Sequence, residues 1–180
     1  VSQVWLLPEK NLGIAILTNQ ESREVYQALT YQLTDFFLQI ADSGDWTELL
    51  QKVLRKQESE ALRSRSQVES SRNRSSRPSL PLEGYVGRYR DDWYGEIEIY
   101  KESGGLVIRF SRTPALIGDL EHWQYDTFLV RWRDRELRAD AYLTFALRPD
   151  GKIDQARMQA VSADTDFSYD FQDLLLKIAR

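Results

Sequence analysis

Apolar residues follow two different spacings along the chain, and the change between them divides it into two halves. Two short, mainly apolar runs, at residues 4–8 and 12–19, flank a polar connection, which is typical of a β-hairpin. Between Val25 and Ile40 the apolar residues recur on one stripe at helical spacing. The pattern therefore predicts a hairpin followed by an amphipathic helix over about residues 22–41.

A second helix is predicted to start just after Gly44, which supplies a stop signal for the first. The carboxylate of Asp45 is placed to cap its first turn, and apolar residues continue at helical spacing as far as Leu54. From Ser64 the sequence is rich in Ser, Arg and Pro and poor in apolar residues, which is typical of a segment that buries too little surface to fold. We therefore expect a flexible linker over residues 64–81, with the domain boundary there.

From Leu82 onward the spacing has a period of two, as in strands with one buried face. Six segments alternate in this way or are enriched in β-branched and aromatic residues: residues 85–89, 95–100, 106–110, 128–132, 142–147 and 156–160. Several short strands separated by turn signals predict an antiparallel sheet that closes into a small barrel. The predicted fold class is α+β, mainly β, with a hairpin and two helices in residues 1–63 and a barrel in residues 82–180.

Composition narrows the range of functions. The chain has a formal charge of −4 and a pI near 5.2, so a dedicated nucleic-acid binder is not expected. It has no cysteine, which excludes a disulfide framework, and no apolar run reaches the roughly 20 residues of a transmembrane segment. Eight basic and three acidic residues between Lys52 and Arg77 give a local charge of +5. A flexible spacer is the favoured interpretation of this basic stretch, and an anion-binding segment is the alternative.

Several motifs in the second half occur in an order that resembles a known domain. They are Tyr85-Val86-Gly87-Arg88-Tyr89, Trp93-Tyr94-Gly95, Leu120-Glu121-His122-Trp123-Gln124-Tyr125-Asp126-Thr127-Phe128, residues 145–152 and residues 166–174. In this order they resemble the lipocalin-like barrel appended to serine hydrolases of the β-lactamase/D-aminopeptidase type. The first half, from Val4-Trp5-Leu6-Leu7-Pro8 to Leu17-Thr18-Asn19, resembles the last two strands and the terminal helix of the hydrolase domain itself.

This resemblance implies that residues 1–63 are a C-terminal remnant of the hydrolase domain, starting just after the strand that carries its third catalytic motif. The sequence is consistent with this, because it lacks the three catalytic motifs of these hydrolases. No Ser has a Lys three positions later, no Tyr-x-Asn occurs, and the only histidine, His122, precedes Trp-Gln. We expect a non-catalytic accessory region whose parent is a serine hydrolase, periplasmic or secreted. The expected partners are the parent hydrolase domain and a second copy of the chain.

Two roles for the barrel stay open. It serves assembly or covers the active-site cleft of the parent, or, as the alternative, it binds a small apolar or aromatic ligand. The candidate pocket or interface residues are Trp93, Tyr94, His122, Trp123, Tyr125 and Trp132. Several of these, with Tyr85 and Tyr89, either line a cavity or fill the interior, and a filled interior is the expectation. For His122, which has no partner His or Cys, we expect a hydrogen bond within the fold.

No catalytic, cofactor-binding or metal-binding residue is expected. The acidic residues Asp164, Asp166, Asp170 and Asp173 lack the loop spacing and the central glycine of an EF-hand, so a solvated turn is favoured over a calcium site. Separated from the rest of a hydrolase sheet, residues 1–41 are expected to expose edge strands and an apolar stripe, and therefore to self-associate.

Overall fold

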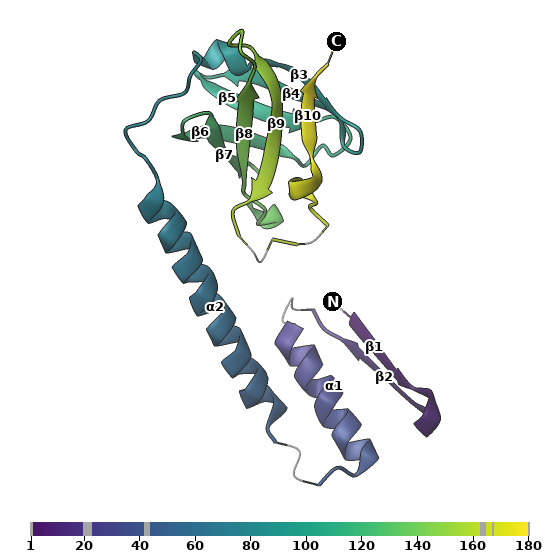
Figure 1. Cartoon of the computed structure of the whole chain (residues 1–180). Helices are drawn as coiled ribbons and strands as arrows, with labels where there is room; N and C mark the ends of the chain where they lie inside the picture. The colour runs from purple at the N-terminus through teal and green to yellow at the C-terminus, as the bar shows by residue number, and fades with distance from the viewer. Residues whose placement is uncertain (1, 20–22, 42–43, 163–164, 167, 180) are drawn as a thin grey trace. The chain divides into compact units, whose positions relative to one another are not determined.

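The computed structural model of the chain describes residues 2–19, 23–41, 44–162, 165–166 and 168–179. They form two compact units, Val1–Arg63 and Ser64–Arg180, and each unit is described by itself. The first contains a β-hairpin and a helix, the second a closed eight-stranded antiparallel barrel, and a second helix crosses the division between them (Figure 1). The predicted fold class is therefore confirmed.

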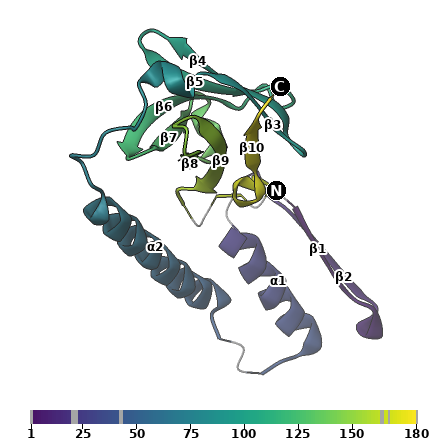
Figure 2. The same ribbon diagram turned by 45° about the horizontal axis from the view of Figure 1, so that its top comes forward.

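The hairpin of the first unit consists of β1 (Ser2–Leu7) and β2 (Leu12–Leu17), joined by a 3-10 turn at Pro8–Lys10. The helix α1 (Arg23–Leu38) lies beside it in both views (Figures 1 and 2). On the face toward α1, Trp5 is paired with the buried Ile14, and its indole meets the ring of Tyr31 edge-on at 6.3 Å. The hairpin and α1 therefore share a small core.

The helix α1 ends earlier than the sequence pattern predicts, and its expected first residue, Ser22, lies outside the described residues. Gln39 adopts a left-handed conformation with a φ of 54°, and the amide of Ile40 donates to the carbonyl of Asp35 at 3.0 Å. This arrangement is a Schellman-type stop, which satisfies carbonyls at the end of the helix. The stop signal is therefore the conformation of Gln39, and the prediction that the helix continues to residue 41 is wrong.

The second helix, α2, spans Trp46–Ser71. Its predicted cap is confirmed, because Oδ1 of Asp45 accepts hydrogen bonds from the amides of Thr47 at 2.8 Å and Glu48 at 3.1 Å. No helix among the described residues combines the length and the apolar character needed to span a membrane.

The expectation of a flexible linker from residue 64 is wrong for its first part, since α2 continues to Ser71. Two features stabilise a helix of this polar composition. The hydroxyls of Ser70 and Ser71 donate to carbonyls three residues earlier, and Glu69 accepts a hydrogen bond from Arg74 at 2.6 Å. Because Glu, Gln, Arg and Ala favour a helix, low hydrophobicity alone does not indicate a linker.

The barrel of the second unit contains eight strands in an up-and-down arrangement. They are β3 (Gly87–Asp91), β4 (Gly95–Glu102), β5 (Gly105–Phe110), β6 (Ile117–Gln124), β7 (Thr127–Trp132), β8 (Ala141–Leu147), β9 (Ile153–Ala160) and β10 (Leu175–Ile178). Each strand pairs with its neighbour in sequence, and β10 pairs with both β9 and β3, which closes the barrel (Figure 2). The sequence pattern missed β6, which alternates charged with apolar residues, and the short β10.

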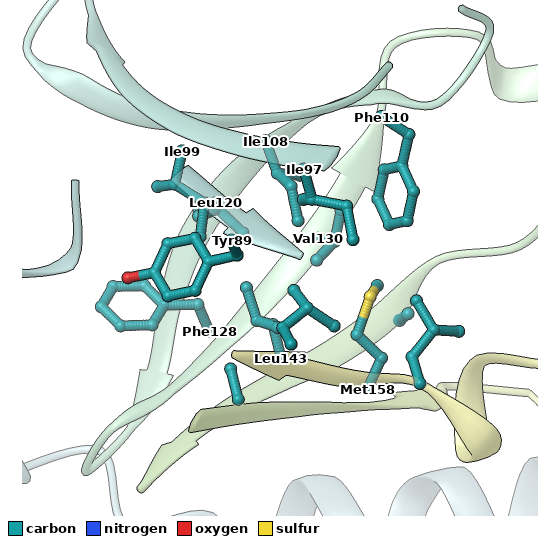
Figure 3. Close-up of a cluster of buried hydrophobic side chains, with 14 of the residues drawn as sticks. Tyr89, Ile97, Ile99, Ile108, Phe110, Leu120, Phe128, Val130, Leu143 and Met158 are labelled. Atoms are coloured by element: carbon teal, nitrogen blue, oxygen red, sulfur yellow. The ribbon is translucent and has the colours of Figure 1, made fainter. Parts of the chain in front are cut away.

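Side chains from all around the wall fill the interior of the barrel. Figure 3 shows Ile97 and Ile99 from β4, Ile108 and Phe110 from β5, Leu120, Phe128, Val130, Leu143 and Met158 packed together with Tyr89. The 3-10 turn η2 (Leu82–Tyr85) places Tyr85 at one end, with its ring centroid 4.9 Å from those of Phe128 and Phe145. At the other end Phe171, on η4 (Phe171–Asp173), stacks on Trp132 at 5.9 Å. The barrel therefore has a packed core closed at both ends.

The inward face of β6 requires a glycine where it passes β7. A Cβ atom on Gly118 would lie 2.7 Å from Cγ1 of Val130 and 2.9 Å from Cε3 of Trp132. We therefore predict that Gly118→Ala lowers the free energy of unfolding of the barrel by about 1–3 kcal/mol, because overpacking displaces core side chains. Gly105→Ala is the matched control, since the nearest atom to its Cβ is the carbonyl oxygen of Glu102 at 3.8 Å. Urea unfolding followed by fluorescence measures both, and equal losses would contradict the prediction.

Candidate functional site

The up-and-down topology places alternate connections at opposite ends of the barrel. The turns after β3 and β5 and the segment after β9 lie at one end, which we call the Trp93 end. The turn between β6 and β7, together with η2, lies at the other end, which we call the Asp126 end. The six candidate residues from the sequence are thereby separated: Trp93 and Tyr94 lie at the first end, His122, Trp123 and Tyr125 at the second, and Trp132 in the core.

Trp132 lies in the core of the barrel and is not part of a surface site. Its indole N–H donates to the carbonyl of Ala139 at 2.6 Å, and the ring packs between Phe110 and Phe171. The side chain is almost completely buried. Trp132 therefore packs in the core and also holds the connection between β7 and β8 in place.

At the Asp126 end, Trp123 holds the residue that follows α2. The guanidinium of Arg72 lies over the indole of Trp123, with its carbon 4.2 Å from the ring centroid. Its Nε donates to the carbonyl of Trp123 at 2.8 Å, and its Nη2 donates to the carbonyl of His122 at 3.1 Å. One side chain thus combines a cation–π contact with two charge-assisted hydrogen bonds.

The residues after Arg72 continue along the turn between β6 and β7. The amide of Asn73 donates to Oε1 of Gln124 at 2.8 Å, and the Asn73 side chain donates to the Tyr125 hydroxyl at 3.0 Å. The amide of Tyr125 in turn donates to the hydroxyl of Ser76 at 3.0 Å. A ring nitrogen of His122 hydrogen-bonds the carbonyl of Tyr125 at 2.9 Å. The segment 72–79, which we call the strap, is therefore fixed to the barrel.

The carboxylate of Asp126 connects the strap to the core. It accepts hydrogen bonds from the amide and the hydroxyl of Ser79, at 2.9 and 2.7 Å, and from the hydroxyl of Tyr85. Burial raises the pKa of Asp126, but the hydrogen bonds from Tyr85 and Ser79 lower it by more, so the net pKa lies below its usual value. Sequence reasoning missed Arg72 and Asp126 as a pair of anchors, because no local pattern links positions about fifty residues apart.

We predict that Arg72→Ala lowers the free energy of unfolding of the barrel by about 1–3 kcal/mol, because it removes two charged hydrogen bonds and the contact with Trp123. Arg74→Ala is the matched control, since Arg74 is exposed and pairs only with Glu69 among the described residues. Its effect should stay within about 0.5 kcal/mol. Urea unfolding of both variants tests this, and an Arg72→Ala loss no larger than that of the control would refute it.

Acid should weaken the anchor at Asp126. Because the folded-state pKa of Asp126 is lowered, its carboxylate stabilises the fold above the pKa of the unfolded chain, about 3.9, and this stability is lost as the pH falls through the lower folded value. We predict that Asp126→Asn makes the loss of stability below about pH 4 less steep than in the wild type. Asp154→Asn, at an exposed position of β9, provides the control. Parallel urea midpoints from pH 6 to pH 3 in all three proteins would contradict the prediction.

At the Trp93 end, the turn between β3 and β4 is fixed by a buried carboxylate. Oδ1 of Asp91 accepts hydrogen bonds from the amides of Trp93 at 2.8 Å and Tyr94 at 2.9 Å, and its Oδ2 accepts one from the amide of Leu175 at 2.9 Å. The ring of Tyr94 packs edge-on against Phe110 at 5.6 Å, whereas the indole of Trp93 is 80% exposed. The backbone of Trp93 is therefore rigidly held while its ring faces solvent.

Arg112 lies across the same turn. Gly95 has a φ of 77°, so its backbone conformation favours glycine, and a Cβ atom there would be 2.7 Å from Nε of Arg112. The guanidinium of Arg112 donates to the carbonyl of Trp93 at 3.4 Å. The Arg112 side chain therefore lies against the turn beside Trp93.

These residues surround a shallow groove of about 350 Å³. Its lining combines aromatic rings, hydroxyls and one cation: Trp93, Tyr94, Arg112, Thr113, Leu116, Ser168 and Tyr169. The ring of Tyr169 stacks on Phe171, so this part of the groove is continuous with the core. Of the sequence candidates, Trp93 and Tyr94 are brought together here, whereas Arg112 had no signal in the sequence pattern.

The acidic residues near this end form turns. Oδ1 of Asp166 accepts a hydrogen bond from the amide of Ser168 at 2.8 Å, and hydrogen bonds from Ser168 lower the pKa of Asp166. Asp170 directly precedes η4, Asp173 is the last residue of η4, and Asp164 lies outside the described residues. Within the part of the chain that the structure describes, no three His, Asp or Glu residues come together as a possible metal site.

The packed interior, the closed wall and the bound strap define a closed eight-stranded antiparallel barrel module whose open surfaces lie at its ends. Residues 71–177 match the family described as a domain of unknown function (DUF3471), and the chain belongs to this family. The matched region starts at the last residue of α2 and so includes the strap.

Among solved structures, the C-terminal domain of penicillin binding protein Rv0907 is similar to this chain. The TM-score is 0.43 at 25% sequence identity, and the alignment covers 61% of this chain and 94% of that chain. The search of curated proteins finds no match.

Proposed function

We propose that the chain is a non-catalytic accessory region of a larger serine hydrolase of the β-lactamase type. In this proposal the first unit completes the sheet of the hydrolase domain, which is its principal partner. The barrel is the appended domain, and its role is to serve assembly or to cover the active-site cleft. The proposal is supported by the sequence resemblance of the hairpin and, above all, by the apolar character of both faces of the hairpin.

The outer face of the hairpin is apolar and exposed. The register places Val4 opposite Ala15 and Ser2 opposite Leu17, on the face that points away from Trp5 and Ile14. Val4 and Leu6 are about two-thirds exposed, and Leu17 is 81% exposed. A two-stranded sheet with apolar residues on both faces is typical of strands from a larger sheet that is covered on each side.

The helix α1 leads to the same conclusion. It packs on the hairpin through Ala28 and Tyr31, which leaves a second apolar stripe at the surface. This stripe consists of Val25, Leu29, Leu33, Phe36 and Phe37. Exposed apolar patches of this extent mark surfaces that bind another protein surface. We therefore assign these faces to the remainder of the hydrolase domain.

The barrel fits the description of an appended domain, because it has a closed core of its own. Its wall has no open edge, since β10 pairs on both sides, and such a unit folds without strands from a neighbour. This independence supports a module that was joined to a hydrolase, whichever of the two roles it performs there.

The proposal predicts that the 180-residue chain self-associates at micromolar concentration, because its apolar faces lack their cover. The double variant Val4→Glu/Leu17→Glu should have a lower average mass than the wild type by light scattering at the same concentration, because it makes one of the two apolar faces polar. Val68→Glu, at an exposed valine of α2 in the second unit, should associate like the wild type.

Two results would count against the proposal. A wild-type chain that is monomeric over the same concentrations would show that the outer face needs no partner. Hydrolysis of an activated ester by the purified chain, faster than by an unrelated protein at the same concentration, would contradict its non-catalytic character.

A further inference from the structure

The indole of Trp93 is exposed, although the backbone that carries it is held in place. A tryptophan that stays 80% exposed gives up the free energy that burial of its ring would provide. Its backbone amide is nevertheless held by Asp91, whose other oxygen is bound to the first residue of β10. The ring is therefore presented on a fixed support, so a ligand that stacks on it pays little to order the turn.

Arg112 adds hydrogen-bond donors beside this ring. Among the described residues its guanidinium makes one hydrogen bond, to the carbonyl of Trp93 at 3.4 Å, which is the long limit for such a bond. No described carboxylate forms an ion pair with it. Four of its five N–H groups therefore remain for solvent or for a ligand, in the planar geometry of a guanidinium.

The other groups of the groove indicate a ligand without net charge. Thr113, Ser168 and Tyr169 contribute hydroxyls, which both donate and accept. An acidic residue is also near, because Asp170 directly follows the lining residue Tyr169 in the chain. A guanidinium at the groove with a carboxylate nearby attracts neither charge strongly, and the hydroxyls of the lining suit a ligand with many hydroxyl groups.

We propose that this groove binds a neutral carbohydrate chain, with one sugar ring stacked on the indole of Trp93 and its hydroxyls hydrogen-bonded to Arg112 and Thr113. A pyranose presents C–H groups on its faces and hydroxyls around its rim, which matches an aromatic platform bordered by polar groups. The volume of about 350 Å³ is at the lower end of ligand pockets, so the groove holds a short part of a chain. The proposed binding does not depend on the hydrolase assignment of the first unit.

The test uses the full 180-residue chain and three neutral tetrasaccharides: tetra-N-acetylchitotetraose, cellotetraose and maltotetraose. Titrations are followed by tryptophan emission and by the NMR signals of the indole N–H groups. We expect saturable binding of at least one sugar, with a Kd of about 1 mM or lower. The indole signal that shifts should be the one missing in Trp93→Ala.

The variants assign the binding to the groove. Trp93→Ala should weaken it about tenfold or more, and Arg112→Ala several-fold. Both should keep the thermal midpoint of the wild type, because both side chains lie at the surface. The matched control is Tyr125→Ala, which removes a 57% exposed aromatic residue at the Asp126 end and should leave the affinity unchanged.

Three results would overturn the proposal. They are the absence of saturation with all three sugars, an undiminished affinity in Trp93→Ala, and an equal loss in Tyr125→Ala. Tetragalacturonate tests the absence of net charge, and tighter binding of this anionic tetrasaccharide than of the neutral ones would contradict a neutral ligand.

Discussion

Closure of the barrel by the short strand β10 is the constraint on which the second unit depends. The four residues Leu175–Ile178 bridge β9 and β3, and without them both strands would present open edges. Asp91 strengthens this closure, because its carboxylate binds the amide of Leu175 as well as the turn that carries Trp93. The same carboxylate thus maintains the wall of the barrel and the shape of the groove, so these two properties are not independent.

A filled interior changes where a ligand can bind in a barrel of this type. The aromatic rings of Tyr85 and Phe171 occupy the two ends, and the space between them is taken by branched apolar side chains. Recognition is then left to the surfaces around the ends. One of these surfaces is already occupied by the strap through Arg72 and Asn73, whereas the Trp93 end presents an aromatic ring and a guanidinium to solvent.

Sequence periodicity predicted the elements with a clear apolar face, namely the hairpin, both helices and most of the strands. It failed where the stabilising contacts are polar or distant. The last turns of α2 have the composition of a linker, and β6 carries Asp119 and Glu121 on its outer face. Trp93 and Tyr94 were proposed from the sequence as aromatic residues that could line a pocket of the barrel. Arg112 was not proposed, because no local pattern places it against Gly95, 17 residues earlier.

The position of Tyr85, whose ring closes one end of the barrel core, also bears on when this end can form. Tyr85 comes first in the sequence of the barrel, but its hydroxyl binds Asp126, 41 residues later, and its ring packs against Phe145 on β8. These contacts join residues 41 and 60 positions apart, so they can form only after the chain as far as β8 has been synthesised. Tyr85 therefore cannot reach its final position while only the first strands of the barrel exist.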